Sequence, residues 1–122
     1  MKKKILLIDD DESILDILYL FLTGEGFEVI LSGSTDATDH LDAMIPDLLL
    51  LDVQIAGSPK TGDQVCAELK KAAAFAHIPI LLVSGEPGLE EIAGHCRADD
   101  FIGKPFELEA ILGKVKQLLQ LN

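Results

Sequence analysis

The chain has 122 residues, of which 21 are acidic and 10 are Lys or Arg, so its formal net charge is −11. This length is typical of one domain, and we expect residues 1–122 to form a single one. The acidic surplus repels the phosphate backbone of nucleic acids and the surface of anionic membranes. We therefore expect no direct nucleic-acid or membrane partner, and instead a cation or a partner with a basic surface.

No segment of the sequence has the pattern of an export signal or a membrane span. The apolar run after the basic start is too short for a signal peptide, and the other apolar runs are too short to cross a bilayer. Cys66 and Cys96 do not form a CxxC pair, and we expect two reduced thiols on helices. These features predict a cytoplasmic protein.

Short apolar runs alternate along the chain with longer amphipathic stretches. Unbroken apolar runs are typical of strands covered on both faces, and they predict strands near residues 4–8, 27–31, 47–52, 78–84 and 100–103. Apolar residues at helical spacing predict helices over residues 14–22, 35–45, 62–75, 89–96 and 106–121. Such alternation predicts a doubly wound α/β fold, in which a parallel sheet carries helices on both faces.

Polar side chains of several kinds follow the predicted strands at their carboxyl ends. The first strand runs into Asp9 and Asp10, and the third runs into Asp52. The fourth strand ends at Ser84, and the fifth runs into Lys104. Ligands of open parallel sheets bind at this edge, near the point where the strand order reverses. The sequence therefore predicts a site that joins three carboxylates, a hydroxyl and an ammonium group.

These groups suit a magnesium site that handles a phosphoryl group. Neighbouring carboxylates raise one another's pKa, and a hard divalent cation such as Mg²⁺ removes that conflict. Asp10 and Asp52 suit direct ligands, and Asp9 suits a ligand bound through water. Ser84 offers a hydroxyl donor and Lys104 a positive charge to a phosphoryl oxygen. Asp52 stands alone after a central strand and is the expected nucleophile, because a carboxylate accepts phosphoryl groups.

Four segments together carry a resemblance to a known family. They are LLIDDDES, DLLLLDVQ, ILLVSG and ADDFIGKPF. At these residues the chain resembles the receiver domains of two-component response regulators, and the resemblance extends over residues 3–121. It implies a flavodoxin-like fold with five parallel strands in the order 2-1-3-4-5. It also implies a switch that catalyses only its own phosphorylation and dephosphorylation, not an enzyme that turns over an external substrate.

The resemblance implies how the acidic site is used. Asp52 would accept a phosphoryl group from the phosphohistidine of a sensor histidine kinase or of a phosphotransfer protein. Asp10, Asp52 and the backbone carbonyl of Gln54 would bind Mg²⁺, and Asp9 would lie in the outer part of the site. Gln54 and Glu86 stand at positions that tune hydrolysis of the phosphoryl group in the family.

The resemblance also implies how a signal would leave the site. Ser84 would hydrogen-bond the phosphoryl group, Lys104 would pair with it, and Phe101 would swing inward as the aromatic switch. The Lys104–Pro105 bond would be cis. An output domain or effector protein would bind the face formed by the fourth helix, fifth strand and fifth helix, about residues 89–121. The resemblance also allows a phosphorylation-dependent dimer.

The sequence departs from the usual family pattern in four places. The loop from Asp52 to Gly62 is longer than usual. This difference affects the shape of the loop next to the expected metal ligands. Ser84 replaces the commoner threonine, so the hydroxyl stays while the methyl group is lost. Phe101 lacks the hydroxyl of the commoner tyrosine. The segment over residues 85–98 is short and rich in glycine, which predicts a short or mobile fourth helix.

Three alternative interpretations stay open at this point. Acidic residues are common in loops, and Asp11 is also placed to cap the first helix. A phosphatase of the haloacid-dehalogenase kind would use Asp9 and Asp11 as its DxD pair, but it would leave Asp52 without a function. A receiver-like module that binds partners without phosphorylation also fits the altered loop. A stand-alone regulator and a fragment of a longer one fit the sequence equally.

Overall fold

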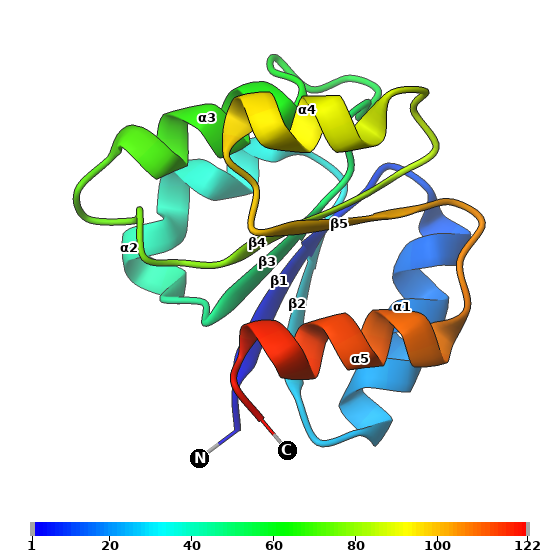
Figure 1. Cartoon of the computed structure of the whole chain (residues 1–122). Helices are drawn as coiled ribbons and strands as arrows, with labels where there is room; N and C mark the ends of the chain where they lie inside the picture. Colours follow the sequence, from blue (N-terminus) through cyan, green and yellow to red (C-terminus); the bar gives the residue numbers. More distant parts are fainter. Residues whose placement is uncertain (1, 122) are drawn as a thin grey trace.

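The structure is a computed structural model that describes residues 2–121 (Figure 1). The elements in chain order are β1 (Lys4–Ile8), α1 (Glu12–Gly24), β2 (Glu28–Ser32), the 3₁₀ helix η1 (Thr35–His40), α2 (Leu41–Met44), β3 (Leu48–Leu51), α3 (Gly62–Lys71), β4 (Ile80–Ser84), α4 (Leu89–Cys96), β5 (Asp100–Gly103) and α5 (Leu108–Leu118). All strand pairs are parallel and the order is β2-β1-β3-β4-β5. The predicted doubly wound, flavodoxin-like fold is therefore confirmed.

The sheet separates two apolar cores. Helices α1 and α5 cover one face, whereas α3, α4 and the η1–α2 segment cover the other (Figure 1). On β3, Leu48 and Leu50 belong to the core under α1 and α5, and Leu49 and Leu51 belong to the core under α3 and α4. Successive strand side chains point to opposite faces, so an unbroken apolar run fills both cores. This is why the central strands have no alternating pattern.

The predicted helix over residues 62–75 is too long, because α3 ends at Lys71. Ala72 has an extended backbone, with φ −86° and ψ 117°. Lys70 donates to the carbonyl of Ile78 (2.9 Å) and forms an ion pair with Asp99 (2.6 Å), so it ties the end of α3 to the segments that precede β4 and β5. These contacts outweigh the helix propensity of the alanines that follow.

The predicted helix over residues 35–45 is also corrected by the structure. Residues Thr35–His40 form a 3₁₀ helix, and only Leu41–Met44 form an α-helical turn. The Thr38 hydroxyl donates to the carbonyl of Thr35 (2.7 Å), and such local bonds compete with regular helix. At the C-terminus, α5 is shorter than predicted and covers Leu108–Leu118, since Glu107 is extended. The bounds of α4 agree with the prediction.

The two cysteines are free and buried at the contact between α3 and α4. The Cys66 thiol donates to the carbonyl of Cys96 (3.3 Å). Burial, with the neighbouring Cys96 thiol as a second cause, raises the pKa of Cys66. A protonated thiol is a weak nucleophile and a poor metal ligand, so this pair is part of the apolar core.

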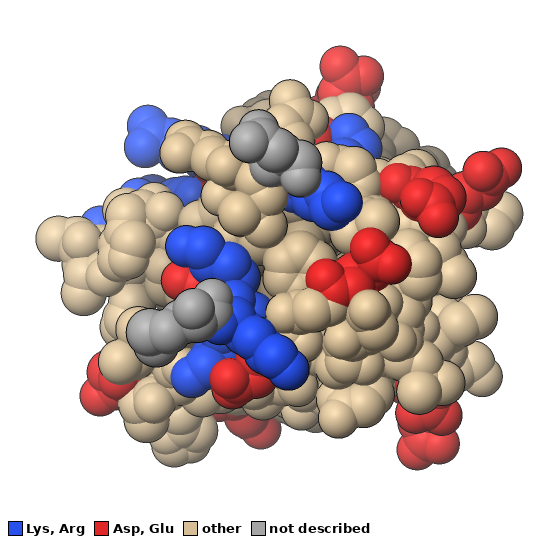
Figure 2. All heavy atoms as spheres, turned by 90° about the horizontal axis from the view of Figure 1, so that it is seen from below, with Lys and Arg blue, Asp and Glu red and all other residues tan. Residues whose placement is uncertain are grey.

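The basic residues are unevenly placed on this acidic chain. Figure 2 shows Lys and Arg side chains gathered on the face seen from below. There Lys2, Lys3 and Lys116 line a hollow of about 550 Å³, whose other walls include Phe27 and Leu121. Lys2 and Lys3 precede β1, so this hollow lies at the opposite end of the sheet from the residues that follow the strands.

None of the helices described is both long and apolar enough to cross a membrane.

Candidate functional site

Three carboxylates meet where β1 and β3 end. The two strands are neighbours, with Ile8 opposite Leu51, so the residues that follow them lie side by side. One carboxylate oxygen from each of Asp9, Asp10 and Asp52 lies within 4.8 Å of the other two. Asp9 and Asp52 are only 2% and 7% exposed, whereas Asp10 is open to solvent. The structure thus brings together the carboxylates that the sequence placed at separate strand ends.

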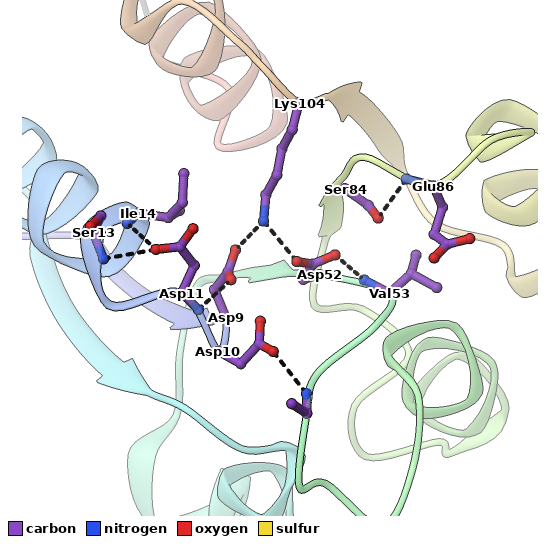
Figure 3. A network of polar contacts seen from close by, with 11 residues as sticks. Asp9, Asp10, Asp11, Ser13, Ile14, Asp52, Val53, Ser84, Glu86 and Lys104 are labelled. Atoms are coloured by element: carbon purple, nitrogen blue, oxygen red, sulfur yellow. Dashed lines mark hydrogen bonds and ion pairs between the residues drawn. The ribbon is translucent and has the colours of Figure 1, made fainter.

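Lys104 joins two of these carboxylates from the end of β5. Its Nζ atom lies 2.7 Å from Oδ2 of Asp9 and 2.7 Å from Oδ2 of Asp52 (Figure 3). Burial alone would lower the pKa of Lys104, but its hydrogen bonds to Asp52 and Asp9 raise it, so the ammonium group stays charged. The Lys104 backbone N–H donates to the carbonyl of Ser84 (2.9 Å), and the Lys104–Pro105 bond is cis.

The negative charge of the cluster is only partly compensated. Burial raises the pKa of Asp9, although Lys104 and the Asp11 backbone N–H both bond to it and lower that pKa. Three carboxylates thus share one ammonium group among the described residues at this edge. Such a surplus of oxygen ligands suits a further cation, and Mg²⁺ prefers carboxylate oxygens.

Ser84 and Glu86 lie on the other side of Asp52, at the end of β4 (Figure 3). Ser84 is 2% exposed, and its Oγ atom accepts the backbone N–H of Glu86 (3.2 Å). Its hydroxyl hydrogen remains available as a donor. Glu86 is half-buried, and Gln54, two residues beyond Asp52, is exposed.

Phe101 lies on β5, between this edge of the sheet and α4. It pairs with Leu82 of the neighbouring strand β4. Its ring is partly buried and packs against the core that includes Leu89 and Ala93 of α4. A displacement of Ser84 or α4 would therefore change the space that this ring occupies.

Asp11 has a structural function. Its Oδ1 atom accepts the backbone N–H groups of Ser13 (2.9 Å) and Ile14 (3.4 Å), which caps α1. It is not among the three clustered carboxylates. The DxD pair that a haloacid-dehalogenase-like site would need is therefore not formed. His40, His77 and His95 are all exposed and lie outside the cluster.

Gly62 is a site residue whose function the sequence did not reveal. A Cβ atom at this position would lie 1.7 Å from the backbone oxygen of Asp52 and 2.8 Å from its carbonyl carbon. The Gly62 N–H donates to the carbonyl of Val53 (2.7 Å). The first turn of α3 thus packs directly on the backbone of Asp52. In the sequence, Gly62 marked only the end of the long loop and the start of a predicted helix.

Asp9→Asn is expected to raise the free energy of unfolding at pH 7 without divalent cations. The pKa of Asp9 is raised by burial, so the folded state binds a proton more readily than the unfolded state. Ionisation therefore destabilises the fold above the ordinary value of 3.8, and a neutral amide removes this penalty. Urea unfolding measures the change, which should shrink as the pH falls toward 3.8.

The exposed helical residue Asp16 supplies the matched control for that substitution. Asp16→Asn should leave the free energy of unfolding nearly unchanged at both pH values. A loss of stability in Asp9→Asn at pH 7 would contradict the account of strained charge in the cluster.

Comparisons with known proteins agree with this geometry. The family model of the response regulator receiver domain matches residues 5–116. The chain is 32% identical over 125 residues to the DNA-binding response regulator MtrA of Mycobacterium tuberculosis (strain ATCC 25618 / H37Rv). This alignment covers 100% of this chain and 53% of MtrA. The chain thus spans about half the length of the curated relatives it matches.

Two solved structures show the same similarity in three dimensions. A response regulator from Chloroflexus aurantiacus J-10-fl has a TM-score of 0.90 at 28% identity, covering 98% of this chain and 99% of that one. A CheY-like receiver domain protein from Methanospirillum hungatei JF-1 has a TM-score of 0.88 at 26% identity, covering 98% and 95%. With the family model matched over nearly the whole chain, this protein belongs to the response regulator receiver domains, the phosphoacceptor modules of two-component signalling.

Proposed function

We propose that Asp52 is the residue that accepts the phosphoryl group, within one receiver domain formed by residues 1–122. The observation that carries the proposal is the position of Asp52 at the end of a central strand, where it is grouped with Asp9 and Asp10 and paired with Lys104. Asp52 is held by the Val53 N–H on Oδ1 (2.7 Å) and by Lys104 on Oδ2 (2.7 Å), so both oxygens are fixed.

The carboxylates fit a bound Mg²⁺ ion. Three oxygen donors within 4.8 Å match the hard oxygen ligands of this metal, and the exposed Asp10 leaves one side open to water. Asp10, Asp52 and the backbone carbonyl of Gln54 would hold the ion, with Asp9 in the outer part of the site. When bound, the ion supplies positive charge that neutralises the oxygens of the transferring phosphoryl group.

The protein's own side chains would complete the transfer. An Asp52 oxygen attacks the phosphorus of a phosphohistidine, a P–O bond forms, and the P–N bond breaks with its electron pair on the histidine nitrogen. Lys104 then pairs with a phosphoryl oxygen, which offsets the negative charge added at this edge. Ser84 donates its hydroxyl to another phosphoryl oxygen. Gln54 and Glu86 flank the group and tune its hydrolysis.

The signal would leave through α4, β5 and α5. Attraction of Ser84 to the phosphoryl group vacates space beside Phe101, and the ring moves inward with a shift of α4. A sensor histidine kinase or phosphotransfer protein supplies the phosphoryl group in the cytoplasm. An output domain or effector protein reads the α4-β5-α5 face, and phosphorylation favours pairing of two copies there. The DNA-binding output in the name of MtrA would need a basic surface supplied by another domain or partner.

Incubation with Mg²⁺ and a small acyl phosphate, followed by intact-mass measurement, tests the phosphoacceptor. One phosphoryl group per chain is expected, and Asp52→Asn should show none because an amide is not a competent nucleophile. Asp16→Asn on the exposed face of α1 should be labelled as the wild type is. Steady release of phosphate by Asp52→Asn would point to a phosphatase, and no adduct on a folded wild type would point to a module that acts without phosphorylation.

A further inference from the structure

The long loop after Asp52 contains a regular turn over residues 55–58. The Ser58 N–H donates to the carbonyl of Ile55 (3.2 Å), and Gly57 has a φ of +79°. This is the pattern of a type II β-turn, whose third residue needs a positive φ and favours glycine or asparagine. Ile55 is 6% exposed and belongs to the core under α3. The extra residues of the loop thus form an anchored turn.

Hydrogen bonds hold this turn from two sides. The Ala56 N–H donates to Oδ2 of Asp10 (2.9 Å), which ties the turn to the acidic cluster. On the other side, Ser58 Oγ accepts the N–H of Thr35 (3.1 Å) and donates to Oγ of Ser34 (3.3 Å). Thr35 is buried at the start of η1. The turn therefore bridges the cluster and a fixed segment on the opposite side of the loop.

We propose that the turn over residues 55–58 positions Asp10 for metal binding. Oδ2 of Asp10 is held by the turn, and Figure 3 shows the other oxygen directed toward Asp9 and Asp52. Asp10 is exposed, and the Ala56 N–H is the hydrogen-bond donor that the structure gives its side chain. The turn also fixes Gln54, the residue before Ile55. This inference rests on the proposed function.

The physical reason is the cost of ordering an exposed ligand. Without the turn, Asp10 would sample several rotamers, and binding the ion would have to restrict them. Outer-shell partners that orient a metal ligand typically change metal affinity by about 10- to 100-fold. Ser58 and Gly57 act one step further out, through the backbone of Ala56, and are positioning residues.

The test is a magnesium titration of the full chain followed by backbone amide NMR. Gly57→Ala strains the positive φ, and Ser58→Ala removes the hydroxyl that accepts from Thr35. Each substitution should weaken Mg²⁺ binding about three- to tenfold. This is less than the effect of removing an outer-shell partner itself, because both residues act through the backbone of Ala56. Gly57→Asn tolerates the same backbone conformation and should bind as the wild type does.

Two further readouts separate positioning from general destabilisation. Gly26 also has a positive φ (+98°) but lies at the other end of the sheet, so Gly26→Ala should lose similar stability without changing Mg²⁺ affinity. The Thr35 amide signal should respond to Mg²⁺ in the wild type and lose that response in Ser58→Ala. If folded Gly57→Ala and Ser58→Ala variants bound Mg²⁺ as tightly as the wild type or more tightly, the positioning role of the turn would be wrong while the proposed function would stand. A wild type that binds no Mg²⁺ would overturn the proposed function as well.

Discussion

Gly62→Ala is expected to lower the free energy of unfolding by about 3 kcal/mol, with loss of most phosphorylation in the folded fraction. A methyl group at this position would lie 1.7 Å from the backbone oxygen of Asp52, and the side chain of Leu51 is also within 3.1 Å. The obstructing atoms are backbone, so the first turn of α3 or the end of β3 must move. Either movement displaces Asp52 from Lys104. Urea unfolding and intact-mass measurement report the two effects.

Gly94 provides the matched control because it also lies in a helix, and nothing lies within 4 Å of a Cβ atom placed there. Gly94→Ala should raise the free energy of unfolding by about 0.5–1 kcal/mol through its better helix propensity. If Gly62→Ala were as stable as Gly94→Ala, the close packing of α3 on Asp52 would be wrong.

Lys104→Met is expected to lower the free energy of unfolding by about 2 kcal/mol without Mg²⁺. The substitution leaves Asp9 and Asp52 buried without their ammonium partner. The loss is smaller than for a fully buried ion pair because 21% of the Lys104 side chain is exposed to solvent. Mg²⁺ should restore part of the stability and bind more tightly than in the wild type, since it replaces the missing positive charge. Unfolding curves with and without Mg²⁺ measure both changes.

Lys60 supplies the control for Lys104, because it forms an ion pair with Glu68 (2.7 Å) at an exposed position. Lys60→Met should show neither the loss of stability nor the stronger response to Mg²⁺. Equal behaviour of the two variants would contradict the assignment of Lys104 as the counter-ion of the cluster.

The sequence predicted the sheet well because its strands are buried on both faces. Runs such as Leu48–Leu51 have no polar residue, and a strand between two helical layers buries all of them. The strand ends then placed Asp9, Asp52 and Lys104 at one edge, since parallel strands share that edge. The alternation of elements predicted a parallel sheet and therefore this shared edge, whereas the strand order β2-β1-β3-β4-β5 was implied by the family resemblance alone.

The sequence could not predict features that depend on distant contacts. The end of α3 depends on Lys70 and Asp99, whose approach is set by packing. The segment over residues 35–45 has the apolar spacing of a helix, but its polar side chains bond locally and give mostly 3₁₀ helix. The turn that contains Gly57 is hydrogen-bonded to Asp10, which lies far away in the sequence. The sequence therefore showed that this loop is longer than usual but not how it folds.

A structure of the full chain with Mg²⁺ and beryllofluoride, a mimic of the phosphoryl group, tests both the phosphoacceptor and the switch. We expect beryllofluoride on an Asp52 oxygen, Lys104 and the Ser84 hydroxyl bonded to its fluorines, and the ion held by Asp10 and Asp52. We further expect that the Phe101 ring moves inward and α4 shifts. Beryllofluoride bound elsewhere would contradict Asp52 as the phosphoacceptor, and a complex on Asp52 with Phe101 and α4 unmoved would contradict the switch.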